Sequence, residues 1–196
     1  MKKGSIIIIV LLAILALGGC QACGVQKTLV TNEESVKAAW GEVENQYQRR
    51  SDLIGNLVET VKGFANHEKS TLEAVIEARA KATQMQVNAE DLTPEKLEEF
   101  QAAQGQLSQA LGRLMVVQEQ YPNIKADAQF LNLQNELTGT ENRVAVARQR
   151  YNTSVQEYNT HLRTIPNNLF AGMFGFKEKG TFKAEAGAEK APKVQF

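Results

Sequence analysis

Apolar side chains recur at spacings of three and four along most of the chain, which is the period of one face of an α-helix. Such stripes run over residues 36–64, 72–82, 97–121 and 130–165. Strand-like alternation of apolar and polar positions is absent from the sequence. The pattern predicts an all-α fold in which four amphipathic helices pack, with coiled coil-like seams, as an up-and-down antiparallel four-helix bundle.

Start and stop signals predict where these helices end. Thr93 precedes Pro94, which places a capping hydroxyl before a proline at the first helical position. Tyr121 precedes Pro122, so the third helix is expected to end there and the next to run to about Arg163. Gly63 interrupts a nearly continuous stripe, and we expect a break there because an unbroken helix would leave much apolar surface uncovered.

The N-terminus predicts a membrane segment. Lys2 and Lys3 precede an aliphatic run over residues 6–17, and no charged side chain occurs over residues 4–26. A helix over that stretch would rise roughly 30 Å, which is enough to span a bilayer. The aliphatic part also has the length of a secretory signal. The two lysines favour a cytoplasmic N-terminus, so the rest of the chain is expected on the extracytoplasmic (periplasmic) side.

Two cysteines follow this run. Leu17-Gly18-Gly19-Cys20 resembles a bacterial lipobox, which makes Cys20 a candidate for lipidation; the competing interpretation is an uncleaved anchor with Cys20 and Cys23 at its interfacial end. A redox or zinc role for the pair needs a strand-to-helix context or further ligands, and the sequence has neither. The interpretation favoured here is the uncleaved anchor.

Charged residues that fall on the apolar stripes predict a structural polar layer, because an isolated buried charge costs several kcal/mol unless it is paired. We expect Arg50 or Arg148 to bond Glu141 and Asp52, with Asn152 and Asn159 beside them. A di-iron site would need two inward-facing Glu-x-x-His motifs, which the sequence lacks. We therefore expect no metal and no cofactor.

The remaining composition excludes further chemistry. Lys and Arg number 22 and Asp and Glu number 22, so no basic field for nucleic acid is expected. No phosphate-binding loop and no nucleophile–base pair stands out, so an enzyme is not predicted. Tyrosines and the single tryptophan lie at helical spacing on the apolar face and are interpreted as core with their hydroxyls reaching solvent or the polar layer.

The tail from Pro166 is aromatic and glycine-bearing and shows no helical stripe, so we expect it to dock rather than to fold alone. Its phenylalanines, Phe170, Phe174, Phe176 and Phe182, are expected to cover one end of the bundle or to touch lipid. Beyond residue 184 the composition is of low complexity. The terminal Val194 and Phe196 match the pattern that PDZ-type domains capture, which makes them a candidate partner-binding tail.

Several longer motifs carry a resemblance that covers nearly the whole chain. They are QRRSDLIGNLV at 48–58, TVKGFA at 60–65, YPNIKA at 121–126, GTENR at 139–143, VARQRYN at 146–152, YNT at 158–160 and IPNN at 165–168. In these motifs the chain resembles the LemA family of bacterial membrane-associated proteins. The resemblance implies a short N-terminal membrane segment, an antiparallel four-helix bundle and no established activity or cofactor. Gly55 stands where that family more often has proline, so a bend is expected there.

Together these observations predict three regions: a membrane anchor or lipoprotein signal over 1–26, a LemA-like helical bundle over 27–165 and a C-terminal tail over 166–196. The predicted function is that of a membrane-tethered, noncatalytic interaction or scaffold module that binds protein partners in the bacterial envelope. The alternative is a ligand-binding or enzymatic bundle that uses the Arg50, Glu141 and Arg148 layer as a polar pocket.

Overall fold

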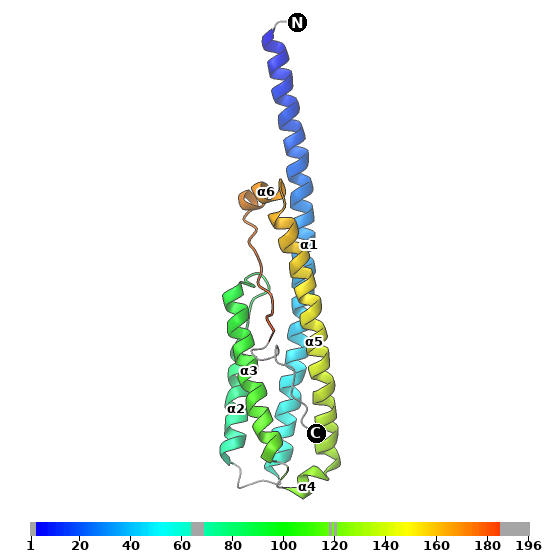
Figure 1. Cartoon of the computed structure of the whole chain (residues 1–196), viewed down its shortest axis with the longest axis vertical. Coiled ribbons are helices and arrows are strands. Elements are labelled where there is room, and N and C mark those ends of the chain that lie inside the picture. Colours follow the sequence, from blue (N-terminus) through cyan, green and yellow to red (C-terminus); the bar gives the residue numbers. More distant parts are fainter. Residues whose placement is uncertain (1–2, 64–68, 118, 120, 185–196) are drawn as a thin grey trace, which may run out of the picture. The chain divides into compact units, whose positions relative to one another are not determined.

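The computed structural model describes residues 3–63, 69–117, 119 and 121–184, and within these ranges it leaves undescribed the side chains of residues 3–10, 13–18, 20, 117 and 125. The described residues form six helices and no strand (Figure 1). These are α1 (Lys3–Lys62), α2 (Lys69–Gln84), α3 (Pro94–Val117), α4 (Pro122–Lys125), α5 (Ala128–Arg163) and α6 (Asn167–Phe174). The all-α prediction is confirmed.

Most of the predicted boundaries are also confirmed. Helix α1 ends at Lys62, directly before Gly63, and α3 begins at Pro94 with the Thr93 hydroxyl 3.4 Å from the Lys96 backbone nitrogen. Helix α5 ends at Arg163, as expected. The third helix is shorter than predicted, because α3 ends at Val117 and the chain makes the separate short helix α4 from Pro122.

Helix α1 is a single element of 60 residues. It passes without interruption through residue 26, where the sequence suggested that an anchor meets a bundle, and through Gly55. Among the residues described, no helix has an apolar stretch long enough to cross a membrane. Most side chains of the aliphatic run over residues 6–17 lie outside that description.

Compact packing divides the chain into two units. Unit 1 comprises Met1–Gln48 and Glu141–Lys179, and unit 2 comprises Arg49–Thr140 and Gly180–Phe196. Helices α1 and α5 each contribute to both units. The boundaries predicted at residues 26 and 165 stay predictions.

Unit 2 is built around an aliphatic cluster. Its side chains come from the last turns of α1, from α2, α3 and α4, and from the first turns of α5. Helices α2 and α3 run antiparallel and pack against each other (Figure 1). The most deeply buried members of the cluster are Ile54, Leu57, Val75, Leu107, Ile124 and Phe130. Helical stripes predicted from the sequence therefore form the core of this unit.

Unit 1 consists mainly of the antiparallel pair formed by α1 and α5 (Figure 1). Its core combines aliphatic side chains with large aromatic ones, of which Trp40, Tyr151 and Tyr158 are each 0% exposed. The rings of Trp40 and Tyr151 meet edge to face, with centroids 5.5 Å apart. The interpretation of these aromatic residues as core is confirmed.

The start of the tail corrects one prediction. Residues 167–174, which were not expected to be helical, form α6, and its C-terminal cap is Gly175 at φ 79°. Leu169 with Met173 and Phe170 with Phe174 are spaced by four residues, which is a helical spacing that a window of only eight residues makes hard to recognise. A positive φ favours glycine, so Gly175 stops the helix.

Candidate functional site

Arg50 is the buried cation of unit 2. Its side chain is 3% exposed, and one terminal guanidinium nitrogen donates to the Ser108 hydroxyl at 2.6 Å. This bond joins α1 to α3. A buried charge is tolerated when it is hydrogen-bonded, and the bond to Ser108 satisfies one of the Arg50 nitrogens.

Arg79 of α2 forms a second polar contact in unit 2. Its Nε donates to the Ser51 carbonyl oxygen at 2.8 Å, and a terminal guanidinium nitrogen lies 4.0 Å from the exposed carboxylate of Asp52. A Cβ at Gly55 would lie 3.0 Å from the central guanidinium carbon. The absence of a side chain at Gly55 therefore lets the guanidinium lie against α1. Helix α1 continues through Gly55, although the proline more common at this position in the LemA family would disrupt a helix there.

The other four residues of the predicted polar layer belong to unit 1. Glu141 is exposed, whereas Arg148, Asn152 and Asn159 are half-buried. Arg50 and Asp52 belong to unit 2, so the predicted pairing of Arg50 with Glu141 stays a prediction. Asn159 bonds a different element: its amide nitrogen donates to the Lys179 carbonyl, and its amide oxygen accepts from the Lys179 backbone N–H.

Three side chains of unit 1 hold the segment that follows α6. Besides Asn159, Tyr158 donates its hydroxyl to the Lys177 carbonyl at 2.9 Å, and Glu33 of α1 pairs with the Lys179 ammonium at 3.0 Å. The Lys179 side chain is 7% exposed. Removing one partner of a buried pair costs about 3–5 kcal/mol, whereas the exposed Arg163–Glu178 pair is expected to contribute less than about 1 kcal/mol.

Burial also changes the acidity of two phenols in unit 1. The burial of Tyr151 raises the pKa of its hydroxyl well above the ordinary value. Burial likewise raises the pKa of Tyr158, and the nearby Glu33 carboxylate raises it further. Both hydroxyls therefore stay protonated at neutral pH and serve as core rather than as bases. The Tyr158 hydroxyl bonds the tail and does not point to solvent.

The chain that continues from Lys179 is held in unit 2. Gly180 donates its N–H to the Leu92 carbonyl at 2.8 Å, and a Cβ on Gly180 would lie 2.7 Å from Pro94 Cα. Phe182 is 6% exposed and packs edge to face on Phe100 of α3. The tail thus docks, as predicted for Phe182. The requirement for glycine at 180 had no signal in the sequence, because the close approach joins segments far apart in the chain.

Several predicted sites lie outside the described residues: the Cys20 side chain and the terminal Val194 and Phe196. Cys23 is described and has an exposed free thiol. Among the described residues, no three His, Cys, Asp or Glu side chains come together as metal ligands would. The lipidation at Cys20 and the partner-binding tail stay predictions.

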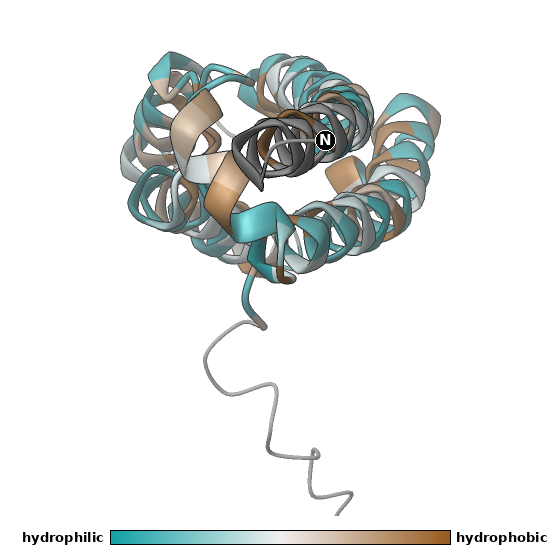
Figure 2. Cartoon of the chain, turned by 90° about the horizontal axis from the view of Figure 1, so that it is seen from above, coloured by the Kyte–Doolittle hydropathy of each residue, from teal (hydrophilic) through white to brown (hydrophobic). Residues whose placement is uncertain are grey.

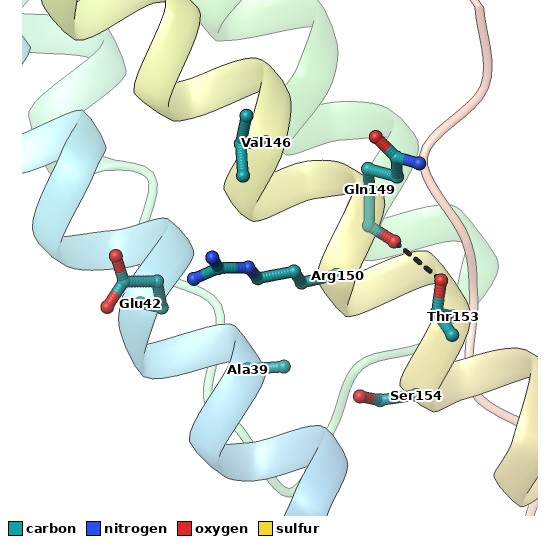
Figure 3. A pocket seen from close by; sticks show the side chains of 7 residues that line it. All are labelled: Ala39, Glu42, Val146, Gln149, Arg150, Thr153 and Ser154. Atoms are coloured by element: carbon teal, nitrogen blue, oxygen red, sulfur yellow. Dashed lines mark hydrogen bonds between the residues drawn. The ribbon is translucent and has the colours of Figure 1, made fainter.

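A groove of about 670 Å³ opens between α1 and α5 within unit 1. Its lining residues are Ala39 and Glu42 from α1 and Val146, Gln149, Arg150, Thr153 and Ser154 from α5. Figure 3 shows Arg150 extending from α5 toward Glu42 on α1. The Glu42 carboxylate accepts a hydrogen bond from Gln46, and the Thr153 hydroxyl donates to the Gln149 carbonyl.

The chemistry of this groove is that of a binding surface. It combines one carboxylate, one guanidinium, amide and hydroxyl groups and the methyl groups of Ala39 and Val146, and Val146 is 48% exposed. None of Arg50, Glu141 and Arg148 lines it. The sequence did not indicate this groove, since its residues are ordinary for the exposed side of a helix.

These features define an all-α protein with long antiparallel helices, a docked C-terminal segment and an open groove along one helix pair. The sequence profile of the LemA family matches residues 39–196. The chain therefore belongs to the LemA family.

Relatives with known names agree with this family. A magnetosome protein MamQ of Paramagnetospirillum magneticum is 30% identical over 173 residues, which cover 80% of this chain and 64% of the relative. MamQ of Magnetospirillum gryphiswaldense is 28% identical, covering 76% of this chain and 61% of the relative. Protein LemA of Metamycoplasma hominis is 22% identical, covering 82% of this chain and 70% of the relative. The chain thus spans less than two thirds of the length of the magnetosome relatives.

Proposed function

We propose that this chain is a noncatalytic, membrane-tethered helical scaffold that binds protein partners in the bacterial envelope. The observation that carries the proposal is the continuity of α1 from Lys3 to Lys62. Residues 4–26 of this helix carry no charge, and its later turns supply core residues to both units. A single helix would therefore join the uncharged stretch to the folded part of the chain without a flexible linker, as a scaffold requires.

The fold we propose for this scaffold is an up-and-down bundle of α1, α2, α3 and α5. Its support is the aliphatic cluster of unit 2, to which all four of these helices contribute. Bundles of this kind pack adjacent helices antiparallel and join them by short connections. Helices α2 and α3, which residues 85–93 connect, are antiparallel neighbours of this kind.

The partner site we propose is the groove between α1 and α5, and its occupant is an amphipathic helix of another protein. An open groove between two helices, with small side chains such as Ala39 and Ser154, lets a third helix approach closely. Glu42 and Arg150 would select a helix with the complementary charges at matching positions. A small ligand would be expected to need a more enclosed site.

Photo-crosslinking in intact cells tests the groove. A photoreactive residue replaces Ser154 in one variant and Gln156 in the other, because Gln156 is exposed on α5 but lies about 200° around the helix. We expect a protein adduct at 154 and none at 156. Equal adducts at both positions, or no protein adduct at 154, would contradict the proposed site. An adduct with the mass of a small molecule would instead favour the ligand-binding alternative.

Membrane fractionation with mass spectrometry tests the tether. We expect the full chain in the membrane fraction with Met1 retained and Cys20 unmodified. A mature N-terminus at acylated Cys20 would establish the lipoprotein alternative. Orientation is tested with A145C in a chain that carries Cys20→Ser and Cys23→Ser, since an extracytoplasmic thiol at this exposed position should react with a membrane-impermeant maleimide in intact cells. Reaction only after lysis would reverse the proposed orientation.

A further inference from the structure

Helix α6 exposes apolar side chains where a helix on a protein surface usually exposes polar ones. Ile165 is 77% exposed, Leu169 66%, Met173 79% and Phe174 41%. Leu169 and Met173 are four residues apart within α6, so they lie on one side of the helix, whereas Ile165 precedes the helix, directly before Pro166. The opposite side is buried through Ala171, which is 1% exposed.

The segment also lacks charge. No Asp, Glu, Lys or Arg occurs from Thr164 to Phe176, whereas basic residues flank it at Arg163 and Lys177. Figure 2 shows α6 drawn mainly in brown and white, the colours of apolar and intermediate residues. Arg163 pairs with Glu178 at 3.6 Å, so the exposed apolar side chains, and not positive charge, would drive contact of α6 with the interface of a membrane.

The position of α6 in unit 1 connects this surface with the N-terminal stretch. Helix α6 lies beside α1 in both views (Figures 1 and 2), and the segment after it is fixed to α1 by the Glu33–Lys179 pair. Among the described side chains of α1, burial begins at Val25 and is complete at Leu29. The uncharged stretch ends at Gln26, so the buried core of unit 1 begins directly where that stretch ends.

We propose that α6 is a lipid-contacting element, and that its exposed apolar side chains, Leu169, Met173 and Phe174, insert into the headgroup region of the bilayer beside α1. The inference rests on the proposed tether, because the tether brings this end of unit 1 to the membrane. Helix α6 would then be a second contact that holds unit 1 at a fixed orientation to the bilayer rather than letting it tilt freely.

Depth-dependent quenching in vesicles tests the proposal. The full chain with Cys20→Ser and Cys23→Ser receives one new cysteine, either M173C in the apolar face or A145C as an exposed control on α5. Each cysteine is labelled with the fluorophore NBD and the protein is reconstituted in phosphatidylethanolamine–phosphatidylglycerol vesicles. A third protein, with only Cys20→Ser, carries the label on the native Cys23 and reports the tether.

Doxyl-labelled lipids should quench the label at 173 and the label on Cys23 by about twofold or more, and should leave the label at 145 unchanged. Quenching on Cys23 without quenching at 173 overturns the role of α6 and leaves the tether standing. A blue-shifted but unquenched label at 173 means that protein covers this face, which also overturns the proposal. Quenching at neither site contradicts both the tether and α6.

Discussion

In unit 2, α1 contributes Ile54, Leu57 and Val61 to an aliphatic cluster, whereas in unit 1 the same helix contributes Trp40 and Tyr47 to a core that combines aliphatic and aromatic side chains. Helix α5 contributes Phe130 and Leu137 to the cluster of unit 2 and the two tyrosines Tyr151 and Tyr158 to the core of unit 1. One continuous helix therefore takes part in two kinds of core. We attribute the difference between the two cores to the number of helices that cover each of them.

The apolar side chains of unit 2 come from α1, α2, α3, α4 and α5, and most of them are aliphatic residues that fill the space between these helices. In unit 1 two long helices have less apolar surface to share, and larger aromatic side chains bury more area for each residue. The polar contacts also differ: in unit 1 Glu33, Tyr158 and Asn159 bind the segment ending at Lys179, whereas in unit 2 the Arg50–Ser108 and Arg79–Ser51 bonds join helices to one another. The two units should therefore respond differently to perturbation.

The largest effect is expected from a cavity in unit 2. Leu107 is 1% exposed in α3, and Leu107→Ala should lower the free energy of unfolding by about 2–5 kcal/mol. Leu131→Ala is the matched control, since Leu131 is 42% exposed, and it should change stability by less than about 0.5 kcal/mol. Chemical denaturation followed by circular dichroism measures both.

Trp40 fluorescence sharpens this test, because the chain has one tryptophan and it lies in unit 1. We expect Leu107→Ala to move the denaturation midpoint seen by circular dichroism further than the midpoint seen by fluorescence. Coincident shifts would mean that the two cores unfold as one and would contradict the division by core chemistry.

The second effect is alkaline destabilisation of unit 1. Burial raises the pKa values of Tyr151 and Tyr158, so above the ordinary phenol pKa of about 10 the unfolded chain loses protons that the folded chain keeps. Stability is therefore fully present below pH 10 and falls as pH rises, by about 1.4 kcal/mol per pH unit for each phenol. Denaturation at pH 9 and pH 11 measures the slope through Trp40 fluorescence.

Tyr151→Phe is the control for this pH dependence, since phenylalanine keeps the ring and removes the ionisable group. The variant should lose about half of the alkaline slope. An unchanged slope would show that groups other than these two phenols control the stability of unit 1 above pH 10.

The third effect concerns the tail in unit 2. Gly180→Ala places a Cβ 2.7 Å from Pro94 Cα, and backbone cannot yield as a flexible side chain can. We expect a cost of about 1–3 kcal/mol and faster hydrogen exchange over residues 180–184. Gly172→Ala is the control, because nothing lies within 4 Å of a Cβ there. If exchange over 180–184 is unchanged in Gly180→Ala, the close packing of the tail is wrong.

The smallest effect is expected from replacing two glycines of α1 by alanine, one at a time. Gly41 in unit 1 has nothing within 4 Å of an added Cβ, so Gly41→Ala should stabilise the protein by up to about 1 kcal/mol. At Gly55 in unit 2 the added Cβ would press on the Arg79 guanidinium, which should cancel that gain. Thermal unfolding measures both. Equal stabilisation by the two substitutions would show that the contact of Arg79 with α1 is unimportant.

Much of the fold could be predicted from the sequence, because helix formation depends on local signals. The three–four spacing predicted the long helices, Pro94 predicted where α3 begins, and Gly63 predicted where α1 ends. The short helix α6 was missed, since eight residues carry too little periodicity. Family membership was also predictable from motifs, and the profile match over residues 39–196 confirms it.

The candidate site was much less predictable. Ala39 and Ser154 line the groove, yet nothing in their local sequence distinguishes them from other residues on a helix surface. The polar layer expected from the charged residues of the stripes stays a prediction. Ser108, however, became a partner of Arg50 through packing between helices that are distant in the chain.

The sequence by itself determined the helical class, the main helix ends, the uncharged N-terminal stretch and the residues that enter the core. These properties depend on periodicity, capping and charge, which act over a few residues. Only the tertiary structure decided that one helix serves two different cores, that Gly180 lies against Pro94, and that Asn159 and Glu33 hold Lys179. Those contacts join residues far apart in the chain, and their geometry depends on how whole helices pack.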